Sequence, residues 1–139
     1  MSKRRREILA IAADLFAERG FASVTVDDIG EAAGVSGPAL YHHFAGKDAL
    51  LGEMLVDISE YLLAGGTKVV AERTAGDDSD PDEVLGRLVR FHAEFAVDRR
   101  SLITVHFRDL VHASDVDQAR VRNLQSRYVG LWCAELQRR

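Results

Sequence analysis

The fold is decided by residues 25–47, which read TVDDIGEAAGVSGPALYHHFAGK. Thr25 is a favourable N-cap, and Asp28 occupies the position that completes a capping box, so a helix is predicted to begin at Val26. Gly34 supplies the left-handed residue at which a helix ends and a turn begins. Ser36 then caps a second helix, which carries a proline in its first turn. Two short helices joined by a tight turn form a helix-turn-helix, whose second helix enters the major groove of DNA.

The second helix, predicted over residues 37–44, presents an unusual outward surface. Leu40 and Phe44 are four residues apart and can face inward together. Tyr41 and His42 are then left outward, and exposed aromatic and imidazole groups suit a surface that approaches phosphates and base edges. The alternative is that these two side chains and His43 cover the edge of a small core, since tyrosine and histidine are of intermediate burial.

From this stretch outward, the chain resembles the TetR family of bacterial transcriptional regulators. The resemblance rests on segments found in order and at compatible spacing, which are LFAERGF at 15–21, TVDDI at 25–29, AAGVS at 32–36, LYHHF at 40–44 and KDALL at 47–51. A lone helix-turn-helix match is a weak signal, whereas this combination is far more specific. The resemblance implies an all-α fold with an N-terminal three-helix DNA-binding domain over residues 1–46. A helical regulatory domain that binds a small ligand is expected over residues 47–139.

The DNA contacts are expected from both helices of the motif and from the basic N-terminus. Lys47 lies at a helix N-terminus, where a cation is unfavourable unless an anion such as a phosphate is present, and the resemblance also implies a phosphate contact there. Thr25 and Tyr41 are the other expected backbone contacts, whereas Ser36, Gly37 and His42 are expected near bases. The full predicted set is Lys3, Arg4, Arg5, Thr25, Ser36, Gly37, Pro38, Tyr41, His42 and Lys47.

The overall charge is acidic, with a net charge of −4 and a pI near 5.7. Basic residues nevertheless cluster at residues 3–6, and Lys47 follows the second helix of the motif. A local basic patch on an acidic protein predicts DNA binding that is salt-sensitive and weak on random sequences. The alternative for residues 3–6 is a solvated tail, although such a tail can still order on phosphates.

The rest of the chain carries helical patterns only. A first helix is predicted from about Arg4 to Arg19, and a fourth from Lys47 past Leu63, with Gly65-Gly66 as a candidate end or kink. Residues 74–80 read as a small, polar, acidic linker. Three more helices are predicted, one from Pro81 to near Val97, one capped by Ser101 and a long one after Ser114. Family members usually continue with two further long helices, so the regulatory domain is expected to be C-terminally incomplete.

The resemblance implies a pocket for a small-molecule effector among these later helices. The candidate lining is mostly apolar and aromatic, with two histidines, and consists of Leu62, Phe91, His92, Phe95, His106, Phe107, Tyr128 and Trp132. Such a lining favours a hydrophobic or amphipathic molecule, for example an acyl thioester or a drug-like aromatic compound. The alternative is plain core packing, because apolar stripes at helical spacing are usually core.

Catalytic and metal chemistry find no support in the sequence. His106 and His112 are six residues apart rather than four, and the single Cys133 forms no zinc-type spacing. We therefore expect no enzymatic activity, no cofactor and no metal. The single cysteine and the lack of any apolar run of about 20 residues predict a cytoplasmic protein that does not enter a membrane.

The sequence thus predicts a sequence-specific transcriptional regulator, a repressor released by its ligand. A homodimer on a palindromic or near-palindromic operator in double-stranded DNA is expected, because one short recognition helix reaches only a few base pairs. Two alternatives remain open. One is the same fold without a small-molecule effector, responding to a protein partner or to nothing. The other is a helical ligand-binding or scaffold protein without DNA binding.

Overall fold

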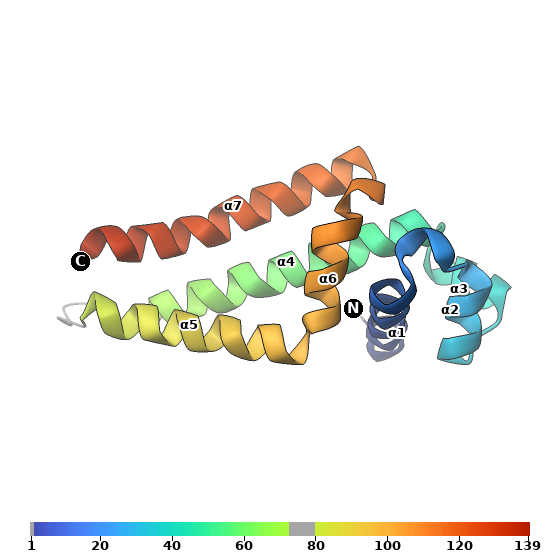
Figure 1. Cartoon of the computed structure of the whole chain (residues 1–139), viewed down its shortest axis with the longest axis horizontal. Coiled ribbons are helices and arrows are strands. Elements are labelled where there is room, and N and C mark those ends of the chain that lie inside the picture. The colour runs from blue at the N-terminus through green and yellow to red at the C-terminus, as the bar shows by residue number, and fades with distance from the viewer. Residues whose placement is uncertain (1, 73–79) are drawn as a thin grey trace. The chain divides into compact units, whose positions relative to one another are not determined.

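The computed structural model describes residues 2–72 and 80–139, and all the regular secondary structure in these ranges is helical (Figure 1). The prediction of an all-α fold is therefore confirmed. In chain order the helices are α1 (Lys3–Arg19), η1 (Phe21–Ser23), α2 (Val26–Ala33), α3 (Gly37–His43), α4 (Lys47–Ala71), α5 (Pro81–Asp98), α6 (Arg100–Asp109), η2 (Leu110–His112) and α7 (Asp115–Arg138). Within the described ranges, no helix has the length and apolar character needed to cross a membrane.

The chain divides into two compact units that are not continuous in sequence. Residues 1–55 and 101–118 form the first unit, and residues 56–100 and 119–139 form the second. The first unit therefore holds α1, α2 and α3 together with nearly all of α6. The predicted division into a DNA-binding domain (1–46) and a regulatory domain (47–139) is a functional one and stays a prediction.

The ends of α2 and α3 follow the sequence signals. The Thr25 hydroxyl accepts a hydrogen bond from the Asp28 N–H (3.0 Å), and the Asp28 carboxylate accepts one from the Thr25 N–H (2.9 Å). The hydrogen bond from the Thr25 backbone, and after it the interaction with the Thr25 side chain, lower the pKa of the Asp28 carboxyl below its usual range. Gly34 ends α2 at a φ of 71°, and the Ser36 hydroxyl opens α3 by accepting from the Ala39 N–H (3.2 Å). Phe44 is extended and caps α3, so this helix is one residue shorter than predicted.

The core of the first unit takes buried side chains from each of its α-helices. Ile8 and Phe16 of α1, Ile29 of α2, Leu40 of α3 and Val105 of α6 are all at most 1% exposed. Burying apolar side chains to this extent is the main force that holds such a unit together. The helix-turn-helix is thus packed on α1 and does not stand alone.

In the second unit, α4, α5 and α7 run lengthwise beside one another (Figure 1). Gly65 and Gly66 neither end nor interrupt α4, which continues to Ala71. Their role is close packing, because a Cβ at Gly65 would lie 2.1 Å from Phe91 Cζ, and one at Gly66 would lie 2.9 Å from Tyr128 Cε1. The glycine pair that resembled a helix end is therefore where α5 and α7 approach α4.

The later helix boundaries agree only in part with the predictions. Asp80 caps α5 by accepting from the Asp82 N–H (3.0 Å), whereas residues 74–79 of the predicted linker lie outside the described residues. Ser114 caps α7 through the Asp117 N–H (3.1 Å). The prediction that Ser101 caps α6 is wrong, because α6 already begins at Arg100.

Candidate DNA interface

The outward face of α3 carries the side chains expected to read DNA. Pro38, Tyr41 and His42 are exposed and Gly37 is half-buried, whereas Leu40 and Phe44 are buried. Tyr41 is 55% exposed, and it also borders the buried side chains of Leu40 and Phe44. Thr25 and Ser36 are also exposed while serving as helix caps. These positions leave the predicted contacts accessible, and their binding to DNA stays a prediction.

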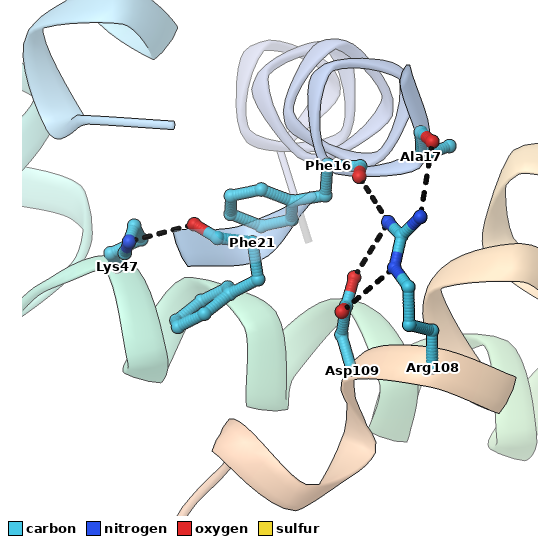
Figure 2. Close-up of polar contacts among 6 residues, drawn as sticks. All are labelled: Phe16, Ala17, Phe21, Lys47, Arg108 and Asp109. Carbon is cyan, nitrogen blue, oxygen red and sulfur yellow. Dashed lines mark hydrogen bonds and ion pairs between the residues drawn. The ribbon is translucent and has the colours of Figure 1, made fainter. Parts of the chain in front are cut away.

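Lys47 is half-buried and points toward the turn after α1 (Figure 2). Its Nζ donates to the carbonyl of Phe21 at 2.7 Å and lies 4.1 Å from the centroid of the Phe21 ring. An ammonium group has three donors, so this hydrogen bond leaves two for another acceptor. A phosphate contact by Lys47 is compatible with this geometry and remains untested.

Two arginines of the basic N-terminus, Arg4 and Arg5, make hydrogen bonds within the first unit. Arg4 donates to the Ala33 carbonyl (2.6 Å), and Arg5 donates to Glu53 Oε1 (2.6 Å) and to the His43 carbonyl (2.8 Å). The Glu53 hydrogen bond raises the pKa of the Arg5 guanidinium above its ordinary value. Lys3 is exposed. The predicted phosphate contacts of these three residues stay predictions. Arg5 already donates hydrogen bonds to Glu53 and to the His43 carbonyl.

A charged contact that the sequence did not reveal joins α6 to the end of α1 (Figure 2). Arg108 donates to both carboxylate oxygens of Asp109 at 3.0 Å, and also to the carbonyls of Phe16 and Ala17. The hydrogen bond to Asp109 raises the pKa of Arg108, and Asp109 itself is only 3% exposed. A cation is favourable here because the last carbonyls of a helix carry partial negative charge.

An aromatic cluster in the second unit brings together five of the eight residues predicted to line a pocket. His92 Nδ1 lies 2.9 Å from the Tyr128 hydroxyl, and the His92 ring also contacts Phe95 and Trp132. The ring of Phe91 packs on that of Tyr61, with 5.8 Å between the two centroids. Tyr61 was not among the predicted pocket residues.

Two polar groups of this cluster sit in unusual surroundings. Burial raises the pKa of the Tyr128 hydroxyl, an effect that the nearby Trp132 indole opposes. The Trp132 Nε1–H is itself buried and has no hydrogen-bond acceptor among the residues that the structure describes.

The other three predicted pocket residues are placed differently. Leu62 is half-buried on α4 in the second unit. His106 and Phe107 belong to the first unit, outside the aromatic cluster. The Phe107 side chain is 89% exposed and so lines no enclosed cavity in this structure, because it lies on the solvent side of α6.

The packing of α1, α2 and α3 defines a helix-turn-helix protein. Residues 8–54 match the family model for bacterial regulatory proteins of the tetR family. Among solved structures, the TetR family transcriptional regulator PfmR from Thermus thermophilus aligns with a TM-score of 0.86 at 30% sequence identity, over 99% of this chain and 71% of that one. The chain belongs to the TetR family of bacterial regulatory proteins.

Several curated relatives carry the name HTH-type transcriptional repressor KstR2, and two of them illustrate the similarity. The protein from Rhodococcus jostii (strain RHA1) is 46% identical over 70 residues, which is 50% of this chain and 34% of that protein. The protein from Mycolicibacterium smegmatis (strain ATCC 700084 / mc(2)155) is 31% identical over 117 residues, which is 84% of this chain and 55% of that protein. The chain thus spans between a third and about half of the length of these relatives.

Proposed function

We propose that this protein is a DNA-binding transcriptional regulator that reads duplex DNA with α3. The observation that carries the proposal is the surface of α3, where Tyr41 and His42 point outward from a helix anchored by the buried Leu40. The relatives named as transcriptional repressors support repression as the direction of control. Because α3 has only seven residues, a homodimer on two related half-sites supplies the specificity that one helix lacks.

Selection of duplexes from a random pool, followed by footprinting, tests this function. The expected product is one preferred sequence with a two-fold symmetric protected region, its half-sites about 34–36 Å or a multiple of that apart. Protection of a single asymmetric half-site by a monomer contradicts the dimeric proposal. Absence of any preferred sequence favours the alternative of a helical protein that does not bind DNA.

Lys47→Ala and His42→Ala are expected to affect binding in different ways. Loss of a phosphate contact at Lys47 weakens binding to all duplexes alike and lowers the slope of log K against log salt by ~1 per site. His42→Ala instead changes which bases are preferred, because base-edge contacts carry the sequence information. Titrations at several salt concentrations, on the selected operator and on single-base variants of it, measure both effects. An unchanged affinity and slope for Lys47→Ala would refute the phosphate contact.

We further propose that the aromatic cluster around His92 binds a small effector that releases DNA. An unsatisfied buried donor costs roughly 1–3 kcal/mol, and a ligand acceptor placed at the Trp132 Nε1–H would recover it. The rings of Phe91, Phe95 and Tyr128 favour an apolar body for the same ligand. Together these features support a hydrophobic or amphipathic molecule with a carbonyl-type acceptor, a class that includes acyl thioesters.

A thermal-shift screen of apolar compounds, matched in pairs with and without a carbonyl group, tests the effector. The carbonyl compounds should stabilise the protein more and should release the operator in proportion to their binding. Trp132→Phe keeps the apolar surface and removes the N–H, so the advantage of the carbonyl compounds should disappear. If no compound both stabilises the protein and releases DNA, the effector-free alternative is the better account.

A further inference from the structure

Two consecutive arginines of α1 reach the C-terminal ends of the two helices of the motif. Arg4 Nη2 donates to the carbonyl of Ala33, the last residue of α2, at 2.6 Å. Arg5 Nη1 donates to the carbonyl of His43, the last residue of α3, at 2.8 Å. Adjacent residues on an α-helix point about 100° apart, so neighbouring side chains can serve two different helices.

Both contacts satisfy groups that the motif leaves open. The last four carbonyls of a helix have no partner within that helix and carry partial negative charge. Because α3 is only seven residues long, these carbonyls belong to more than half of its residues. A planar guanidinium can donate to such a carbonyl and still hold its other donors in a fixed direction toward a second partner. The donors of an ammonium rotate freely and are not held in this way.

Arg5 is held in place from three sides. Its Nε and Nη2 both donate to the Glu53 carboxylate of α4, and both of these side chains are 28% exposed. Its guanidinium carbon lies 4.3 Å from the centroid of the Phe44 ring, which immediately follows α3. The charge of Arg5 is thus balanced by Glu53, and three of its five N–H donors bond protein atoms. A side chain in this state is a poor partner for a DNA phosphate.

We infer that Arg4 and Arg5 are positioning residues that fix α2 and α3 in the geometry that reads DNA, and that Arg5 supports specific recognition without touching the DNA. This inference rests on the proposed DNA-binding function. The cluster at residues 3–6 then has two roles, because Arg6 is exposed and forms no ion pair within residues 2–72 and 80–139. Arg6 is the matched control for Arg5.

Charge-conserving variants separate positioning from simple attraction. Arg5→Lys keeps the positive charge but loses the two-pronged contact with Glu53, so its affinity for the selected operator should fall at least about tenfold. Its affinity for an unrelated duplex of equal length should stay unchanged. Arg6→Lys should match the parent protein on both duplexes. Circular dichroism identifies the variants that are folded. If Arg5 contributed to stability alone, a folded variant would keep the parent protein's ratio of operator affinity to affinity for the unrelated duplex.

Glu53→Gln tests the inference through the direction in which the DNA affinity changes. Removing an acidic group from a DNA-binding unit raises the affinity for every duplex on grounds of charge alone. If Glu53 acts by holding Arg5, the variant instead binds the operator more weakly. The slope of log K against log salt gives a second test. Arg6→Gln should reduce this slope by ~0.9 if Arg6 meets a phosphate, whereas Arg5→Gln should leave it unchanged.

The inference is overturned if Arg5→Lys binds the operator as the parent protein does, or if Glu53→Gln tightens operator binding. Should Arg5→Lys fail to fold, the sign of the Glu53→Gln effect decides. If the parent protein prefers no duplex, the proposed function fails. Amide hydrogen exchange then tests whether Arg5 positions α3, independently of DNA binding. Arg5→Lys should speed exchange in α3 relative to Arg6→Lys, and equal exchange rates would refute the positioning role.

Discussion

Phe16→Ala is expected to lower the free energy of unfolding by about 3–5 kcal/mol, the usual cost of removing a fully buried aromatic side chain. Phe16 is 0% exposed, and its ring lies 5.2 Å from that of Phe21 between centroids. The total stability of a domain is about 5–15 kcal/mol, so this loss removes much of it. Urea titration followed by far-UV circular dichroism measures the change, and operator binding should weaken as the folded fraction falls.

The same unit contains a matched control. Phe107 is also a helical phenylalanine, but it is 89% exposed, so Phe107→Ala should change the free energy of unfolding by no more than about 0.5 kcal/mol. A loss of less than about 1 kcal/mol for Phe16→Ala, or similar losses for both variants, would show that the packing of α1 on α2 and α6 is not the core of the unit.

Gly30→Ala is expected to disrupt specific DNA binding. A Cβ at this position in α2 would lie 2.8 Å from the carbonyl oxygen of Val35 and 3.9 Å from the amide nitrogen of Gly37. These are backbone atoms of the turn that leads into α3, so they cannot move aside as a flexible side chain does. Overpacking of this kind costs about 1–3 kcal/mol, and the displacement falls on the start of the helix expected to meet the bases. Operator affinity should fall at least about tenfold, with little change on unrelated duplexes.

Gly86→Ala is the corresponding control in α5. Nothing lies within 4 Å of a Cβ built there, and the residue has no positive φ. Replacing an exposed helical glycine by alanine stabilises a protein by about 0.4–1 kcal/mol, so this variant should melt slightly higher and bind DNA normally. Wild-type operator binding by Gly30→Ala would show that the turn is more adaptable than its contacts indicate.

The helix ends near the motif were predictable because their signals are local. Thr25, Asp28, Gly34 and Ser36 act on atoms three or four residues away, so their spacing in the sequence is also their spacing in space. The buried positions Leu40 and Phe44 likewise follow from helical periodicity. For the same reason, the residues placed on the outer face of α3 are exposed in the structure.

Contacts between distant parts of the chain could not be predicted in this way. Glu53 is 48 residues from Arg5, and Arg108 is 92 residues from Phe16, so no local pattern links either pair. Phe107 was expected to line a pocket because it is aromatic, but its burial depends on which face of α6 packs on α1. Gly65 and Gly66 have the composition of a helix end, and only the neighbouring rings of Phe91 and Tyr128 explain them as packing positions.

The split composition of the first unit has a consequence for its synthesis. Val105, which is 0% exposed, and the buried Asp109 complete a unit whose other part ends at Leu55. At about 5–20 residues per second, a ribosome needs several seconds to make the 92 residues that separate Phe16 from Arg108. During that interval the carbonyls at the end of α1 lack the Arg108 donor, and the apolar surface that Val105 covers is still exposed. The helices expected to read DNA are thus synthesised first, but the unit that holds them is completed only after α6 has been made, and the apolar surface exposed until then favours aggregation.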